Sequence, residues 1–95
     1  MKVFWTPPAR TDLQSAVQAL ADEGEVDFAL GLLAEADRVD ALLRRIPFAG
    51  PRLEGCNDRK LRLGRLPFVV RYRIKNGTLE ILRLHHARSD WQSFL

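Results

Sequence analysis

The C-terminal part of the chain decides the fold, and residues 57–95 read NDRKLRLGRLPFVVRYRIKNGTLEILRLHHARSDWQSFL. Apolar and basic residues alternate along three segments of this stretch, 59–63, 68–75 and 78–86. Because successive side chains of a strand point to opposite faces, we predict three β-strands with one apolar and one cationic face. Asn76-Gly77, between the last two segments, predicts a two-residue hairpin of type I′.

The alternation assigns every strand residue to a face. The apolar face is expected to pack against helices and to carry Leu61, Leu63, Phe68, Val70, Tyr72, Ile74, Glu80, Leu82, Leu84 and His86. The cationic face is expected to stay in water and to carry Lys60, Arg62, Val69, Arg71, Arg73, Lys75, Leu79, Ile81, Arg83 and His85. On this assignment Tyr72, the chain's one tyrosine, is a core ring with its hydroxyl at an edge rather than a catalytic group.

Two amphipathic helices are predicted upstream of these strands. Thr6 followed by two prolines is typical of a helix start, and apolar residues at helical spacing continue to about Asp22. Gly24 is expected to break this helix. A second apolar stripe predicts a helix from about Val26 to Arg45, which Pro47 stops because the residue before a proline disfavours the helical conformation.

The element order defines the fold class. Lys2–Trp5 is a short apolar strand candidate, so the predicted order is β-α-α-β-β-β within one domain, residues 1–95. Two helices that precede a three-stranded meander cannot form βαβ repeats with it. We therefore predict an α+β fold in which a helical hairpin packs on one face of a small antiparallel sheet, with the first strand beside a later one.

Charge is distributed unevenly along the chain. Residues 1–56 carry six Lys/Arg and nine Asp/Glu, whereas residues 57–95 carry nine Lys/Arg and three Asp/Glu. Such segregation gives the protein a directional field that can steer an anionic partner to its basic side. An acidic protein segment and a nucleic acid are both expected candidates for this partner.

Several functional classes are disfavoured by composition. Cys56 is the one cysteine, so neither an internal disulfide nor a cysteine metal site is expected, and we predict no metal and no cofactor. No apolar run has the length of a membrane helix, and the N-terminus lacks the pattern of a signal peptide. These features indicate a cytoplasmic protein without membrane contact. Residues 91–95 form a short apolar tail, either docked on the core, with Trp91 as a plug, or left for a partner.

The chain resembles the ParE/RelE superfamily of toxins from bacterial type II toxin–antitoxin systems. The resemblance covers nearly the whole chain and extends to its length and element order. It is carried by Trp5, Arg10, Asp12-Leu13, Pro51-Arg52, Arg59-Lys60-Leu61-Arg62, the stretch Leu66–Ile74 (LPFVVRYRI) and the stretch Ile81–Trp91 (ILRLHHARSDW). The Pro-Phe-Val-Val-x-Tyr and Ile-Leu-x-x-x-His-x-x-x-Asp-Trp segments are its specific parts.

The superfamily divides by mechanism. The resemblance to its RelE-like branch implies a metal-independent endoribonuclease that cleaves messenger RNA on the ribosome. In this chain Lys60, Arg62 and Arg83 would then stabilise the transition state, and His85 would act as the base. Two departures weaken that assignment: Val69 stands where nucleolytic relatives usually have an arginine, and their C-terminal tyrosine has no counterpart. His85 and His86 also point to opposite faces of a regular strand and cannot line one site.

The ParE-like branch is therefore favoured. It implies a plasmid-stabilisation-like toxin, not an enzyme, that inhibits DNA gyrase and replication and is neutralised by a small antitoxin whose C-terminal segment folds on binding. A folded homologue without toxicity, kept as an antitoxin-binding or regulatory partner, is a third alternative. The expected contact residues for target or antitoxin are Arg62, Arg71, Arg73, Arg83, His85 and Arg88.

Overall fold

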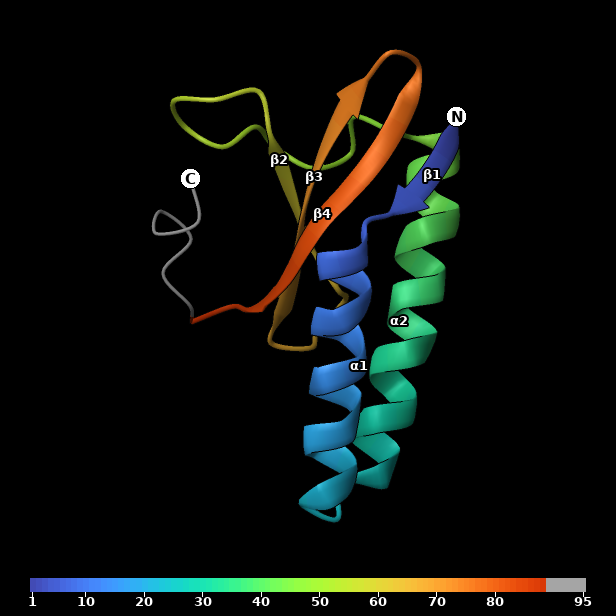
Figure 1. The fold of residues 1–95 in the computed structure, drawn as a ribbon, viewed down its shortest axis with the longest axis vertical. Coiled ribbons are helices and arrows are strands. Elements are labelled where there is room, and N and C mark those ends of the chain that lie inside the picture. Colours follow the sequence, from blue (N-terminus) through green and yellow to red (C-terminus); the bar gives the residue numbers. More distant parts are fainter. Residues whose placement is uncertain (89–95) are drawn as a thin grey trace.

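The structure is a computed structural model that describes residues 1–88, so the predicted tail at residues 91–95, including Trp91, lies outside the described part. The elements follow the predicted order (Figure 1). They are β1 (Lys2–Trp5), α1 (Pro7–Asp22), α2 (Val26–Arg45), β2 (Arg59–Arg62), β3 (Phe68–Lys75) and β4 (Thr78–His86). Both helices and three strands have the predicted bounds, and β2 ends one residue early, at Arg62; the next residue, Leu63, is fully buried.

Local signals explain where the helices begin and end. Thr6 is the N-cap of α1, and its hydroxyl accepts a hydrogen bond from the Ala9 amide at 3.3 Å. Gly24 adopts φ 79°, a left-handed conformation that suits glycine and lets the chain reverse into α2. The two helices form the hairpin that lies along one side of the sheet in Figure 1. The predicted α+β layout is confirmed.

The sheet has the strand order β1-β4-β3-β2. β2, β3 and β4 form the predicted antiparallel meander, while β1 joins β4 in parallel, so the complete sheet is mixed rather than purely antiparallel. Asn76 and Gly77 link β3 to β4 with φ values of 52° and 76°. Positive φ at both central residues is the signature of a type I′ turn, which confirms the predicted hairpin.

A β-bulge in β4 overturns part of the predicted face assignment. Arg71 pairs with Arg83, but its neighbour Tyr72 pairs with Ile81, so Leu82 is an extra residue in β4. Strict alternation is therefore wrong on the hairpin side of the bulge. Leu79 and Ile81 face the core and are fully buried, while Glu80 faces the other side with Arg73. Leu84, beyond the bulge, packs in the core as predicted.

The core lies between the helical hairpin and the apolar face of the sheet. Leu32, Val39 and Leu43 of α2 meet the strand residues there, and all three are fully buried. Tyr72 is also fully buried, and its hydroxyl donates to the Pro47 carbonyl and accepts from the Gly50 amide, both at 2.9 Å. Tyr72 is thus a core ring that fastens the loop after α2, as predicted.

Candidate functional site

The predicted site residues lie in rows across the face of the sheet that points away from the helical hairpin. Directly paired strand residues share a face, so the pairing defines the rows. Lys60, Arg71 and Arg83 form one row across β2, β3 and β4. The next row consists of Arg62, Val69 and His85.

Three arginines of this face are bound by carboxylates of the same chain. Both the Nε and Nη2 atoms of Arg71 contact the Asp58 carboxylate, with Nε at 2.8 Å. Arg73 pairs with Glu80 at 2.9 Å. Arg83 pairs with Asp12 through Nε at 2.8 Å and Nη2 at 3.1 Å. The face is consequently less cationic than its sequence predicts, because acidic residues from distant segments neutralise its centre.

Burial also differs from the prediction that the whole cationic set stays in water. The side chain of Arg71 is 9% exposed, whereas that of Arg73 is 43% exposed. His85 is buried as well. Arg62 and Arg88 are exposed, and among the predicted contact residues they present their charge to solvent most fully.

Asp12 joins the start of α1 to the bulge of β4. Besides binding Arg83, its Oδ2 atom accepts the Leu84 amide at 3.0 Å. Thr6 contributes in the same region, since its Oγ1 lies 3.0 Å from the carbonyl oxygens of Ile81 and Leu82. β1 ends at Trp5, opposite Ile81, so these two side chains satisfy backbone groups of Leu82 and Leu84, which lie beyond the end of β1. The sequence placed Asp12 in the helix but gave no sign of this role.

The two histidines occupy different environments. His85 lies opposite Val69 on the arginine-bearing face, while His86 lies opposite Phe68 on the other face, as predicted. Burial, followed by the nearby Arg83 guanidinium, lowers the pKa of His85, so its neutral form is favoured at neutral pH. His86 is exposed, packs edge-on against Phe68, and accepts the Arg88 amide at 3.2 Å.

We expect His85 to make the protein less stable in mild acid. Its lowered pKa means that the native state binds fewer protons than the unfolded chain, whose histidine pKa is near 6.5. The free energy of unfolding should therefore fall as the pH is lowered from about 7.5 to about 5.5, and a His85→Gln variant should show a shallower fall. Urea unfolding at several pH values measures both slopes. Equal slopes in the two proteins would contradict the assignment.

The residues of the nuclease alternative share a face without forming a compact group. Lys60 and Arg62 come from β2, whereas Arg83 and His85 come from β4. β3 separates these strands, which places their backbones about 9–10 Å apart. Val69 fills the position between Arg62 and His85. The hydroxyl of Tyr72 is held on the opposite side by the loop, so it does not supply an acid to this face.

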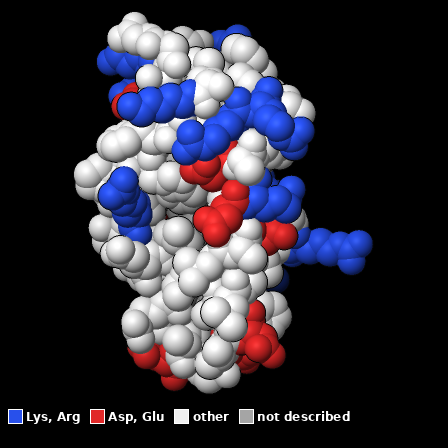
Figure 2. Space-filling view, turned by 90° about the vertical axis from the view of Figure 1, so that its right-hand side faces the viewer, with Lys and Arg blue, Asp and Glu red and all other residues white. Residues whose placement is uncertain are grey.

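Basic side chains that have no carboxylate partner within residues 1–88 concentrate near the edge strand β2. Arg62 donates to the Leu66 carbonyl, Arg59 to the Gly50 carbonyl and Arg52 to the Asn57 amide oxygen. All three acceptors are neutral and leave the positive charge uncompensated. Figure 2 shows the side of the molecule on which α2 lies: basic side chains gather at its upper end, basic and acidic ones mix at mid-height, and acidic ones lie at its lower end. Neither Arg52 nor Arg59 is among the contact residues predicted from the sequence.

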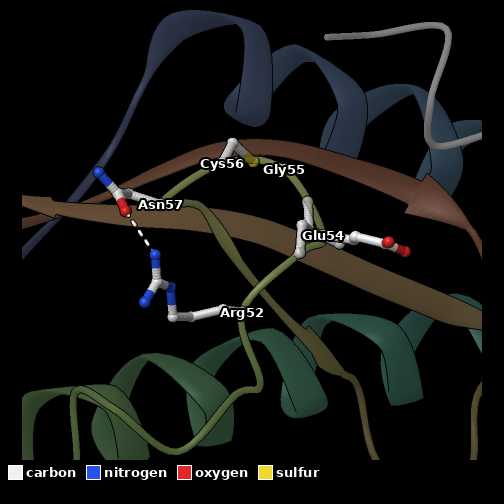
Figure 3. Close-up of a pocket in the computed structure, with 6 residues that line it drawn as sticks. Arg52, Glu54, Gly55, Cys56 and Asn57 are labelled. Atoms are coloured by element: carbon white, nitrogen blue, oxygen red, sulfur yellow. Dashed lines mark hydrogen bonds between the residues drawn. The ribbon is translucent and has the colours of Figure 1, made fainter.

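A hollow of about 570 Å³ lies in the loop of residues 52–57. Figure 3 shows Arg52 and Asn57 pointing toward one another across this loop, while Glu54 points away. Their hydrogen bond is 2.6 Å long, and the Leu53 amide donates to the Asp58 carbonyl at 2.7 Å. The loop thereby places Asp58 at the start of β2, where it binds Arg71.

Within residues 1–88 no helix is long and apolar enough to cross a membrane. The same residues contain no group of three or more His, Cys, Asp or Glu side chains arranged to hold a metal ion. The helical hairpin and the small sheet have the α+β element order predicted from the sequence.

Comparison with known proteins identifies the family. Residues 3–91 match the family described as the ParE toxin of the type II toxin–antitoxin system parDE. The chain belongs to this ParE toxin family. It is also similar to a solved chain of the chromosomal ParDE toxin–antitoxin system from P. aeruginosa, with 25% identity and a TM-score of 0.77 over 90% of this chain and 95% of that one. No curated protein matches the sequence.

Proposed function

We propose that this toxin arrests growth by inhibiting DNA gyrase, and that a cognate antitoxin neutralises it by direct binding. Membership of the ParE toxin family supports both a toxin role and an antitoxin partner. The observation that carries the choice against ribonuclease chemistry is the burial of His85 and its separation from Lys60 and Arg62, which lie on β2, beyond β3. Val69 stands between Arg62 and His85, and Asp12 and Asp58 bind the central arginines.

The antitoxin is proposed to bind the arginine-bearing side of the sheet with an acidic C-terminal segment that folds as it docks. Arg62, Arg73, Arg83 and Arg88 would contact it or the target directly. Arg71 and His85 would support this surface from beneath, because both are buried. The similar P. aeruginosa chain comes from a ParDE toxin–antitoxin system, which is consistent with an antitoxin partner here.

Pulse labelling in cells tests the target. After induced expression without antitoxin, thymidine incorporation should fall before methionine incorporation does. An earlier collapse of methionine incorporation would identify the ribonuclease alternative instead. Normal growth with both rates unchanged, in cells that contain the folded protein, would identify a non-toxic homologue.

Charge reversal at exposed arginines tests the binding surface. We expect an Arg62→Glu, Arg88→Glu double variant to bind the antitoxin at least about tenfold more weakly, because like charges would then face one another. Titration calorimetry with the purified antitoxin measures the change. Arg38→Glu, on the exposed surface of α2, is the control and should bind nearly as wild type does. Arg71 is unsuitable for this test because a glutamate there would be buried beside Asp58.

A further inference from the structure

Two arginines face each other at the end of the sheet without an ion-pair partner. Arg52 and Arg59 are the two members of an isolated antiparallel bridge. Like charges placed directly opposite one another destabilise a sheet. Within residues 1–88 neither guanidinium forms an ion pair, and their acceptors are the Asn57 side-chain oxygen at 2.6 Å and the Gly50 carbonyl at 2.8 Å. A bound anion would relieve this repulsion.

An exposed aromatic ring lies beside the same pair. Phe48, in the connector after α2, is 62% exposed, and the Arg59 guanidinium carbon lies 4.9 Å from its ring centroid. The ring and the two arginines line a hollow of about 330 Å³ together with Asn57 and Ile74. Ile74 supplies an apolar wall, and the Asn57 amide retains donors after accepting from Arg52.

We propose that this hollow binds a nucleotide of a single-stranded nucleic acid. The base would stack against Phe48 and the plane of Arg59, as bases do on aromatic and guanidinium planes in single-strand binders. Arg52 and Arg59 would hold the adjacent phosphate, since each guanidinium keeps several N–H donors free of its one neutral acceptor. Asn57 would hydrogen-bond the base edge.

The chemistry favours a nucleotide over an acidic peptide. An acidic peptide needs cations alone, whereas this hollow combines cations with an exposed ring, an amide and an apolar wall. The orientation of Arg52 also fits, because its bond to Asn57 brings guanidinium and amide together, as Figure 3 shows. The hollow lies on the helix side of β2, whereas Arg62 lies on the opposite face, so this activity goes beyond the proposed function and stands apart from it.

Fluorescence anisotropy of the purified full chain with a labelled oligodeoxyadenylate of about ten nucleotides tests the proposal. Binding at low salt is expected, and Phe48→Leu should weaken it by about fivefold to a hundredfold, the range for loss of one stacked base. Arg52→Gln should also weaken binding. The slope of log affinity against log salt concentration should become shallower by about 0.7, the contribution of one phosphate contact on a single strand. Arg10→Gln, the same charge change at an exposed position of α1, should leave affinity nearly unchanged.

Two competitors separate the alternatives. A duplex of equal length and a poly-glutamate peptide should both bind more weakly than the single strand. Binding of poly-glutamate with equal affinity would overturn the proposal in favour of an acidic-peptide site. Equal binding of the duplex would also overturn it, because attraction to phosphate alone would then account for the affinity. Wild-type affinity in Arg52→Gln, whose changed side chain is exposed, would also overturn it.

Discussion

Replacing Asp58 with alanine is expected to destabilise the protein by about 3–5 kcal/mol, the usual cost of removing one partner of a buried ion pair. Asp58 binds Arg71 through two nitrogen atoms, and the two side chains are 15% and 9% exposed. The variant would leave the Arg71 guanidinium buried without this carboxylate. Urea unfolding followed by circular dichroism gives the difference in free energy.

Glu80→Ala is the matched control for that loss. It removes the carboxylate bound to Arg73, in a pair whose side chains are 43% and 26% exposed. Solvent screens such a pair, so the expected cost is only about 0–1 kcal/mol. Equal losses in the two variants would contradict the conclusion that burial distinguishes Arg71 from the rest of the arginine-bearing face.

Gly50→Ala is the second large effect, with an expected loss of about 3 kcal/mol or more. A Cβ atom at residue 50 would lie 2.1 Å from the backbone oxygen of Lys60 and 3.0 Å from the Tyr72 hydroxyl. The loop after α2 would have to move, and the hydrogen bonds that hold it to Tyr72 would be strained. The thermal midpoint and the urea midpoint of the variant both measure this loss.

Gly31→Ala provides a control with the opposite sign. Gly31 lies within α2, and nothing comes within 4 Å of a Cβ built there. Alanine is the better helix former, so this variant should be more stable than wild type by about 0.5–1 kcal/mol. If Gly50→Ala were as stable as wild type, the close approach of the loop to β2 would be wrong.

Most of the fold follows from short-range signals. Thr6, Gly24 and Asn76-Gly77 each dictate a local conformation, so helix starts, helix ends and the hairpin could be predicted. The bulge in β4 could not be read from alternation alone. Its trace in the sequence is the change of apolar phase from Leu79 and Ile81 to Leu82 and Leu84. The parallel entry of β1 depends on pairing across more than 70 residues, which no local pattern specifies.

The site was less predictable because its charges are balanced over long distances. Arg83 and Asp12 are 71 positions apart, and Arg71 and Asp58 are separated by a turn and a strand. A strand pattern shows that arginines share a face, but not which carboxylates reach them. Arg62 and Arg88 were among the predicted contact residues, but the structure was needed to show that they are exposed while Arg71 and His85 are buried. The opposed pair of Arg52 and Arg59 likewise emerges only from the structure.

The most direct test of the proposed function is supercoiling of a relaxed plasmid by purified DNA gyrase in the presence of the purified toxin. Supercoiling should fall as toxin is added, and preincubation of the toxin with its antitoxin should restore it. Undiminished supercoiling at a large molar excess of folded toxin would contradict gyrase inhibition.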